Sequence, residues 1–152
     1  MPGISNRKIL IVDDDERYLR ALGKTLRSEG ALVTATQWAV EAIDILSQAG
    51  KMDLVIIDLR MPLVNGEMLL RSIRLLSADL PIIVLTAFGS AETRAEALRQ
   101  GATAFLEKSL ASSELLVAIE KIVESQRPVK DSFETTAPRE IGKLEGTEGP
   151  IP

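Results

Sequence analysis

Four short apolar runs, separated by longer segments of a different periodicity, constrain the fold of this chain more than any other feature. The runs are Ile9–Val12, Leu54–Ile57, Ile82–Leu85 and Ala104–Leu106. They are too short for helices, are mostly β-branched and do not alternate with polar residues, which indicates strands covered on both faces, as in a parallel sheet. A weaker run at 31–35 has a polar interruption and suits an edge strand.

Segments with helical spacing lie between these runs. Their apolar positions are Tyr18, Leu19, Leu22 and Leu26; Val40, Ile43, Ile45 and Leu46; Leu69, Leu70 and Ile73; and Leu115, Leu116, Ile119, Ile122 and Val123. Gly30 and Gly50 follow the first two segments, where a helix commonly ends. A further segment, roughly residues 91–100, offers only alanines and Leu98 as apolar contacts, so we expect it to dock most weakly of the five. Strands that alternate with helices in this way predict right-handed βαβ units and a doubly wound α/β sandwich.

The alternating pattern ends near Gln126. Residues 127–152 hold four of the seven prolines and three of the ten glycines, and their apolar residues lack periodicity. We interpret them as a flexible tail or a truncated linker that follows a domain of residues 7–126. The first apolar run is much shorter than that of a signal peptide, and no window approaches the roughly 18 apolar residues of a membrane span. We therefore expect a cytoplasmic protein without a membrane partner.

Polar residues that could carry chemistry follow the predicted strands. In open α/β sheets, ligands bind beyond the carboxyl ends of the strands, and there the runs deliver Asp13, Asp14, Asp58, Thr86 and Lys108. The sequence contains neither histidine nor cysteine, and an oxygen-only cluster favours a hard cation such as Mg²⁺. Thr86 could donate a hydrogen bond to a phosphoryl oxygen, and Lys108 could neutralise another. Asp58 is then the candidate nucleophile that forms an aspartyl phosphate.

Each of these positions also has an ordinary structural role open to it. Asp58 could be a turn residue, and Lys108 could be a solvated surface charge. Asp15, which follows the acidic pair, is expected to cap the first helix. The single tryptophan, Trp38, is expected to pack and not to bind a ligand. Such separate roles do not explain why acids, a hydroxyl and a lysine converge on one edge of the sheet.

The ordered set of motifs resembles the receiver domains of two-component response regulators. The matching stretches are Lys8–Asp15, Asp53–Pro62 with Asn65-Gly66, Leu85–Ser90 and Gly101–Lys108. The resemblance covers about residues 7–126. It implies a CheY-like, flavodoxin-like (βα)5 sandwich whose parallel strands have the order 2-1-3-4-5.

The resemblance also implies roles for the strand-end residues. Asp58 would accept a phosphoryl group from a phosphohistidine on a sensor histidine kinase or phosphotransfer protein, and Lys108 would contact that group. The ligands of Mg²⁺ would be Asp13, Asp14, Asp58 and the backbone carbonyl of Arg60. Thr86 and Phe105 would form a switch pair that alters a face built from the fourth helix, fifth strand and fifth helix. That face could also join two copies in a homodimer.

The sequence departs from the family pattern in ways that bear on function. Ser109 follows Lys108 where the family usually has proline after a cis bond, so this bond is either trans or a strained cis bond. The switch residue Phe105 lacks the hydroxyl of a tyrosine. Arg60 and Phe88 lie two positions beyond Asp58 and Thr86 and offer no carboxylate or amide to orient water. We therefore predict slow self-dephosphorylation of a domain that is not otherwise an enzyme.

Three other interpretations remain open at this point. A receiver-like interaction module that is never phosphorylated would share the whole pattern. A flavodoxin-type electron carrier would need a hydroxyl-rich phosphate loop after the first strand, where this chain has three aspartates. A small hydrolase that forms an aspartyl phosphate would have a second acid in place of Arg60. Direct binding of nucleic acid is not expected from a net charge of -4.

Overall fold

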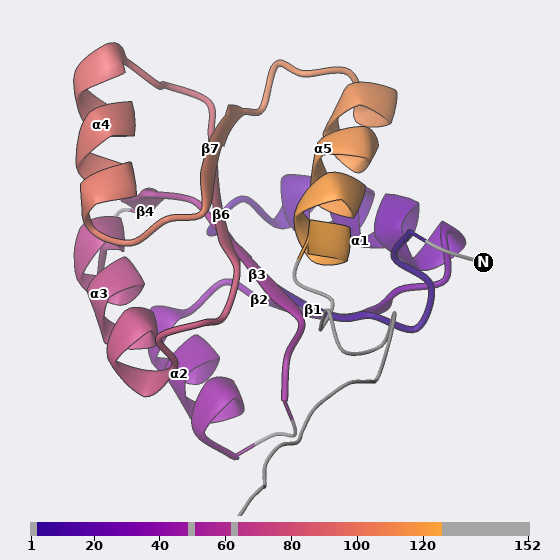
Figure 1. Ribbon diagram of the computed structural model, residues 1–152, viewed down its shortest axis with the longest axis horizontal. Coiled ribbons are helices and arrows are strands. Elements are labelled where there is room, and N and C mark those ends of the chain that lie inside the picture. Colours follow the sequence, from indigo (N-terminus) through magenta and orange to yellow (C-terminus); the bar gives the residue numbers. More distant parts are fainter. Residues whose placement is uncertain (1–2, 49–50, 62–63, 126–152) are drawn as a thin grey trace, which may run out of the picture.

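A central parallel sheet lies between two layers of helices (Figure 1). The computed structural model describes residues 3–48, 51–61 and 64–125. The strands of the sheet are β1 (Lys8–Val12), β2 (Leu32–Thr36), β3 (Leu54–Ile57), β6 (Ile82–Thr86) and β7 (Ala104–Glu107). They pair in parallel in the order β2-β1-β3-β6-β7. The predicted α/β class and the strand order 2-1-3-4-5 are confirmed, with β6 and β7 as the fourth and fifth strands.

Five helices connect these strands and cover both faces of the sheet. They are α1 (Glu16–Ser28), α2 (Ala39–Gln48), α3 (Gly66–Leu76), α4 (Ala91–Arg99) and α5 (Ser112–Ser125). α1 and α5 lie on one face, and α2, α3 and α4 lie on the other (Figure 1). Gly30 follows α1 with a φ of 95°, a left-handed conformation that suits glycine at the end of a helix. Gly50 and residues 126–152, including the predicted tail, lie outside the described residues.

Each face of the sheet supports its own apolar core. Successive side chains of a strand point to opposite faces, so Ile9 and Ile11 of β1 pack with α1 and α5, whereas Leu10 and Val12 pack with α2 and α3. All four side chains are at most 1% exposed. Burial on both faces explains why this apolar run does not alternate with polar residues.

Two side chains on the outer part of this fold lie elsewhere than the sequence pattern predicts. Val40 was predicted on the apolar face of α2, but it is 75% exposed, and α2 buries Ala39 and Ala42 in its place. The pair Ala39 and Ala42 is spaced i, i+3 on one helix face, which turns Val40 outward. Trp38, just before α2, is 57% exposed and does not belong to the buried core.

A short antiparallel pair outside the main sheet was not predicted. It consists of β4 (Arg60–Met61) and β5 (Val64–Asn65), which pair Arg60 with Asn65. Two-residue strands are too short to have a periodicity that a sequence could show. The pair lies directly after Asp58 and leads into α3, so it fixes the path of the chain beside the candidate site.

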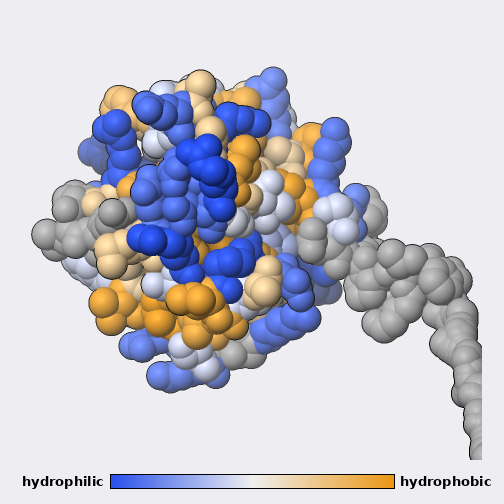
Figure 2. Space-filling model, turned by 60° about the vertical axis from the view of Figure 1, so that its left-hand side comes forward, coloured by the Kyte–Doolittle hydropathy of each residue, from blue (hydrophilic) through white to orange (hydrophobic). Residues whose placement is uncertain are grey.

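Helix α4 is weakly docked, as its sequence predicts. Ala97 is its only buried residue, and Leu98 is 39% exposed. Figure 2 shows a largely hydrophilic surface at the height of α4, whereas apolar side chains gather lower on this face, at the height of α2 and α3. A helix that buries so little apolar surface can shift at small cost. Of the described helices, none has the length and apolar character that crossing a bilayer requires.

Candidate functional site

The carboxyl ends of four strands bring the candidate residues together. Asp13 follows β1, Asp58 follows β3, Thr86 ends β6, and Lys108 comes directly after β7. Backbone hydrogen bonds hold these ends level: the Asp58 N–H donates to the Val12 carbonyl at 3.1 Å, and the Lys108 N–H donates to the Thr86 carbonyl at 2.9 Å. Strand order therefore places side chains from distant parts of the sequence at one edge of the sheet, as predicted.

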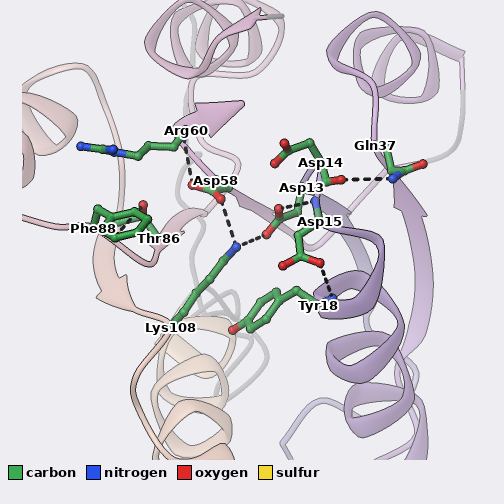
Figure 3. A network of polar contacts seen from close by, with 10 residues as sticks. All are labelled: Asp13, Asp14, Asp15, Tyr18, Gln37, Asp58, Arg60, Thr86, Phe88 and Lys108. Carbon is green, nitrogen blue, oxygen red and sulfur yellow. Dashed lines mark hydrogen bonds and ion pairs between the residues drawn. The ribbon is translucent and has the colours of Figure 1, made fainter. Parts of the chain in front are cut away.

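Lys108 joins the two buried carboxylates (Figure 3). Its Nζ lies 2.6 Å from Asp13 Oδ2 and 3.0 Å from Asp58 Oδ2. The Lys108 side chain is 12% exposed, and the carboxylates are 4% and 7% exposed. Buried ion pairs are screened little by solvent and salt. Removing one partner would leave the other as an unpaired buried charge, which is strongly destabilising.

The other oxygen of each carboxylate accepts a backbone hydrogen bond. The Asp15 N–H donates to Asp13 Oδ1 at 2.9 Å, and the Arg60 N–H donates to Asp58 Oδ1 at 3.0 Å. The two side chains are thus held at both oxygens, which fixes their orientation. Asp15 itself caps α1 by accepting a hydrogen bond from the Tyr18 N–H, so its predicted capping role is confirmed.

The charges of this cluster oppose one another. Burial raises the pKa of Asp13, although Lys108 and the Asp15 N–H act in the opposite direction. Burial alone would lower the pKa of Lys108, but its hydrogen bonds to Asp13 and Asp58 outweigh burial and raise it. Lys108 therefore stays charged at neutral pH and is the internal counter-ion of the two carboxylates.

The acidic residues also fit a divalent cation. Carboxylate oxygens of Asp13, Asp14 and Asp58 lie within 4.8 Å of one another. Asp14 is half-buried, and its carbonyl accepts a hydrogen bond from Gln37 Nε2 at 3.1 Å, which holds this part of the loop. One lysine does not balance three carboxylates. An all-oxygen donor set with excess negative charge is the kind that Mg²⁺ prefers.

The two predicted switch residues, Thr86 and Phe105, are both buried. Thr86 is 2% exposed, and its Oγ1 accepts a hydrogen bond from the Phe88 N–H at 3.4 Å. Phe105 is 4% exposed and packs under the backbone of Gly89, where an added Cβ would lie 2.8 Å from the ring. Arg94 of α4 donates to the Phe105 carbonyl at 3.1 Å. The loop after β6 thus connects Thr86 to α4 and β7.

Two contacts at the site were missed by the sequence reasoning. The Tyr18 ring lies 4.3 Å from Lys108 Nζ, and the Arg60 guanidinium lies 5.0 Å from the Phe88 ring centroid. Tyr18 fits the apolar stripe of α1, so its periodicity concealed this second contact. The available signal was an aromatic residue four positions after Asp14. Among the described residues there is no cis peptide bond, so Lys108–Ser109 is trans.

Comparison with known proteins identifies the family. Residues 9–120 match the response regulator receiver domain. The chain belongs to this family. Its acidic pocket of Asp13, Asp14 and Asp58 lies where the receiver fold collects its strand ends. The match rules out the flavodoxin-type electron carrier and the small hydrolase, because a receiver domain belongs to two-component signalling and is not a classical enzyme.

Individual relatives agree with this assignment. The transcriptional regulatory protein GlrR of Escherichia coli K12 is 37% identical over 123 residues, which are 81% of this chain but 28% of GlrR. A CheY-like receiver domain from Methanospirillum hungatei superimposes with a TM-score of 0.75 at 29% identity and covers 80% of this chain and 97% of its own. A Burkholderia pseudomallei response regulator with a phosphorylated aspartic acid, a calcium ion and citrate has a TM-score of 0.70 at 26% identity, covering 79% and 70%. The chain thus spans less than a third of GlrR.

Proposed function

We propose that Asp58 is the phosphoacceptor of this receiver domain and that its donor is a phosphohistidine on a sensor histidine kinase or phosphotransfer protein. The observation that carries the proposal is the shared position of Lys108 between the Asp13 and Asp58 carboxylates, at 2.6 and 3.0 Å. The phosphorylated aspartic acid of the Burkholderia relative supports it. We take residues 7–126 as the unit that performs this function.

Phosphoryl transfer to Asp58 requires a positioned carboxylate and groups that neutralise the charge on the phosphoryl oxygens. A carboxylate oxygen of Asp58 attacks phosphorus, the bond from phosphorus to the donor imidazole nitrogen breaks, and that nitrogen keeps the electron pair and takes up a proton. Lys108 neutralises charge on the phosphoryl oxygens, and the Thr86 hydroxyl donates to one of them. Asp58 is held for the attack by the Arg60 N–H at 3.0 Å.

We assign the Mg²⁺ ligands to Asp13, Asp14, Asp58 and the backbone carbonyl of Arg60. Bound there, the ion would neutralise the acidic pocket and the incoming phosphoryl oxygens. The cluster of three carboxylates within 4.8 Å supports this assignment. Asp13 and Asp14 then have no chemical step of their own and serve to hold charge in place.

Phosphorylation would reach the surface through the loop after β6. The Thr86 hydroxyl now accepts from the Phe88 N–H, and a phosphoryl oxygen on Asp58 gives it a stronger, charged partner. Movement of Thr86 shifts the loop that lies over the Phe105 ring, and Phe105 and Arg94 carry the shift to α4. The face of α4, β7 and α5 would be the output surface, and it could pair two copies of the domain.

The phosphoacceptor is tested with acetyl phosphate and Mg²⁺, followed by intact mass. We expect a gain of one phosphoryl mass that is lost in Asp58→Ala. The matched control is Asp44→Asn, which changes an exposed acid in the middle of α2. A wild-type chain that gains no mass, or an Asp58→Ala chain that still gains it, contradicts the proposal. The first outcome would favour the receiver-like interaction module that is never phosphorylated.

The coupling to α4 is tested separately with beryllofluoride, an analogue of the phosphoryl group. We expect amide shifts across residues 86–108, which include Thr86, α4 and Phe105. Thr86→Ala should still bind the analogue but lose the shifts in α4. Unchanged amide shifts throughout residues 86–108 in the wild-type protein would show that phosphorylation does not use this route.

A further inference from the structure

Tyr18 has a position that its place in an apolar stripe does not explain. It lies in the first turns of α1 and is half-buried, and its ring centroid is 4.3 Å from Lys108 Nζ. Figure 3 shows the ring beside the end of the lysine, away from Asp58. The ammonium group thus has carboxylates on one side and an aromatic face on the other.

The end of the Lys108 side chain is held mainly by its contacts with other side chains. Its backbone is fixed by the hydrogen bond from its N–H to the Thr86 carbonyl at 2.9 Å. Its side chain has four rotatable bonds, and the hydrogen bonds that hold its end go to Asp13 and Asp58. Asp58 is the group that changes when a phosphoryl group arrives, so one of these anchors is altered during the reaction.

An aromatic face can hold the ammonium group without taking part in that exchange. The attraction comes from the ring quadrupole and leaves the three N–H donors free to point at oxygens. Lys108 can therefore redirect its hydrogen bonds from Asp58 to a phosphoryl oxygen while the nitrogen stays in place. The phenol itself remains neutral, because burial raises the pKa of Tyr18.

We infer that Tyr18 is a positioning residue for phosphoryl transfer, whose ring face holds the Lys108 ammonium group against Asp13 and Asp58. The inference rests on the proposed function of Asp58. The contact requires a ring and not a hydroxyl, so phenylalanine should serve and an aliphatic side chain should not. Tyr18 also lines a groove between α1 and α5, together with Thr25 and Leu115. A residue that only filled this groove could be replaced by leucine without loss.

The test uses acetyl phosphate as donor, so that no partner surface is involved. With saturating Mg²⁺, Tyr18→Leu should slow phosphorylation of Asp58 by a factor between about 2 and about 30, the range of one cation–π contact. Tyr18→Phe should restore most of that loss. Thr25→Ala, at another position that lines the same groove, should leave the rate unchanged. Circular dichroism and thermal unfolding verify that each variant is folded.

A spectroscopic measurement tests the contact independently of the reaction. Tyr18 is the only tyrosine in the sequence, so the absorbance titration of phenol reports on this residue alone. The Lys108 charge favours the phenolate, so Lys108→Met should shift the titration to higher pH and alter the near-ultraviolet signal of the ring. Thr25→Ala should change neither.

The outcomes separate this inference from the proposed function. A wild-type rate in Tyr18→Leu, or a tyrosine titration that does not respond to Lys108→Met, overturns the role of Tyr18 and leaves Asp58 as phosphoacceptor. A slow Tyr18→Phe variant also overturns it, because the hydroxyl would then be required. If the wild-type protein takes up no phosphoryl group, the proposed function fails and the role of Tyr18 fails with it.

Discussion

At the scale of single residues, the side chains of Arg60 and Phe88 pair beside the site (Figure 3). The Arg60 guanidinium lies 5.0 Å from the Phe88 ring centroid, and each residue lies two positions beyond a site residue. Neither side chain can accept a proton from water or orient it for attack on the aspartyl phosphate. The pair therefore supports the prediction of slow self-dephosphorylation.

Replacing Arg60 with an amide should shorten the lifetime of the phosphorylated state. We expect Arg60→Asn to speed the loss of phosphoryl mass by roughly tenfold, a modest part of what a positioned proton acceptor contributes. The measurement is intact mass against time after removal of acetyl phosphate. Arg20→Asn, at an exposed position of α1, is the control. A wild-type half-life of seconds, against an expectation of minutes or more, would show that Arg60 and Phe88 are not protective.

Lys108 should make stability fall at alkaline pH. Its pKa is raised in the folded protein by its hydrogen bonds to the two carboxylates, so its contribution is complete below the unfolded value of about 10.5 and is lost as pH rises through the folded value. Lys108→Met leaves two buried acids unpaired and should cost about 3 kcal/mol at pH 8 without metal. Urea unfolding should show a smaller difference between the two proteins at pH 11. An equal difference at both pH values contradicts this sign.

At the scale of elements, two glycines allow the loops beside the site to pack closely against neighbouring residues. A Cβ on Gly66, the first residue of α3, would lie 2.4 Å from the Leu59 Cα. A Cβ on Gly89 would lie 2.8 Å from the Phe105 ring. The first contact is with backbone next to Asp58, which cannot move without moving the site. The second is with a side chain that can turn.

The two glycines should therefore respond differently to alanine. We expect Gly66→Ala to cost about 3 kcal/mol, because overpacking against backbone outweighs the gain of up to about 1 kcal/mol in helix propensity. Gly89→Ala should cost about 1 kcal/mol, and Phe105→Leu in the same chain should recover most of it. Thermal unfolding measures both, at about 4–8 °C per kcal/mol. If both substitutions lowered the free energy of unfolding equally, the backbone before α3 would be able to move away from the added methyl group.

At the scale of the whole molecule, we expect the acidic pocket to link stability to metal binding. Mg²⁺ that binds only the folded chain stabilises it by RT ln(1 + [L]/Kd), which is about 2.7 kcal/mol at 100 times the dissociation constant. We expect urea unfolding in Mg²⁺ and in EDTA to differ by an amount of this order. Asp14→Asn should remove most of the difference, and Asp44→Asn should keep it. An equal response of both variants would place the ion elsewhere.

Most of the fold and of the site could be predicted from the sequence, because both follow from the buried strands. The first predicted run, Ile9–Val12, differs from β1 by one residue, and Asp13, Asp58 and Lys108 converge because strand order requires it. What could not be predicted depends on side-chain direction. Val40 faces outward, and Tyr18 contacts both the apolar core and Lys108. A pattern of spacing records which residues are apolar but not which neighbours they meet.

The ion pairs of Lys108 with Asp13 and Asp58 have a consequence for the protein during its translation. Asp13 leaves the ribosome among the first residues of the domain, and Lys108 follows only after all five parallel strands have been made. Until then the acids lack Lys108 as a counter-ion, and the fifth strand, which ends one residue before Lys108, is incomplete. We therefore expect that a nascent chain cannot accept a phosphoryl group before Lys108 has been translated. Incomplete chains would then not compete with complete ones for the phosphoryl donor.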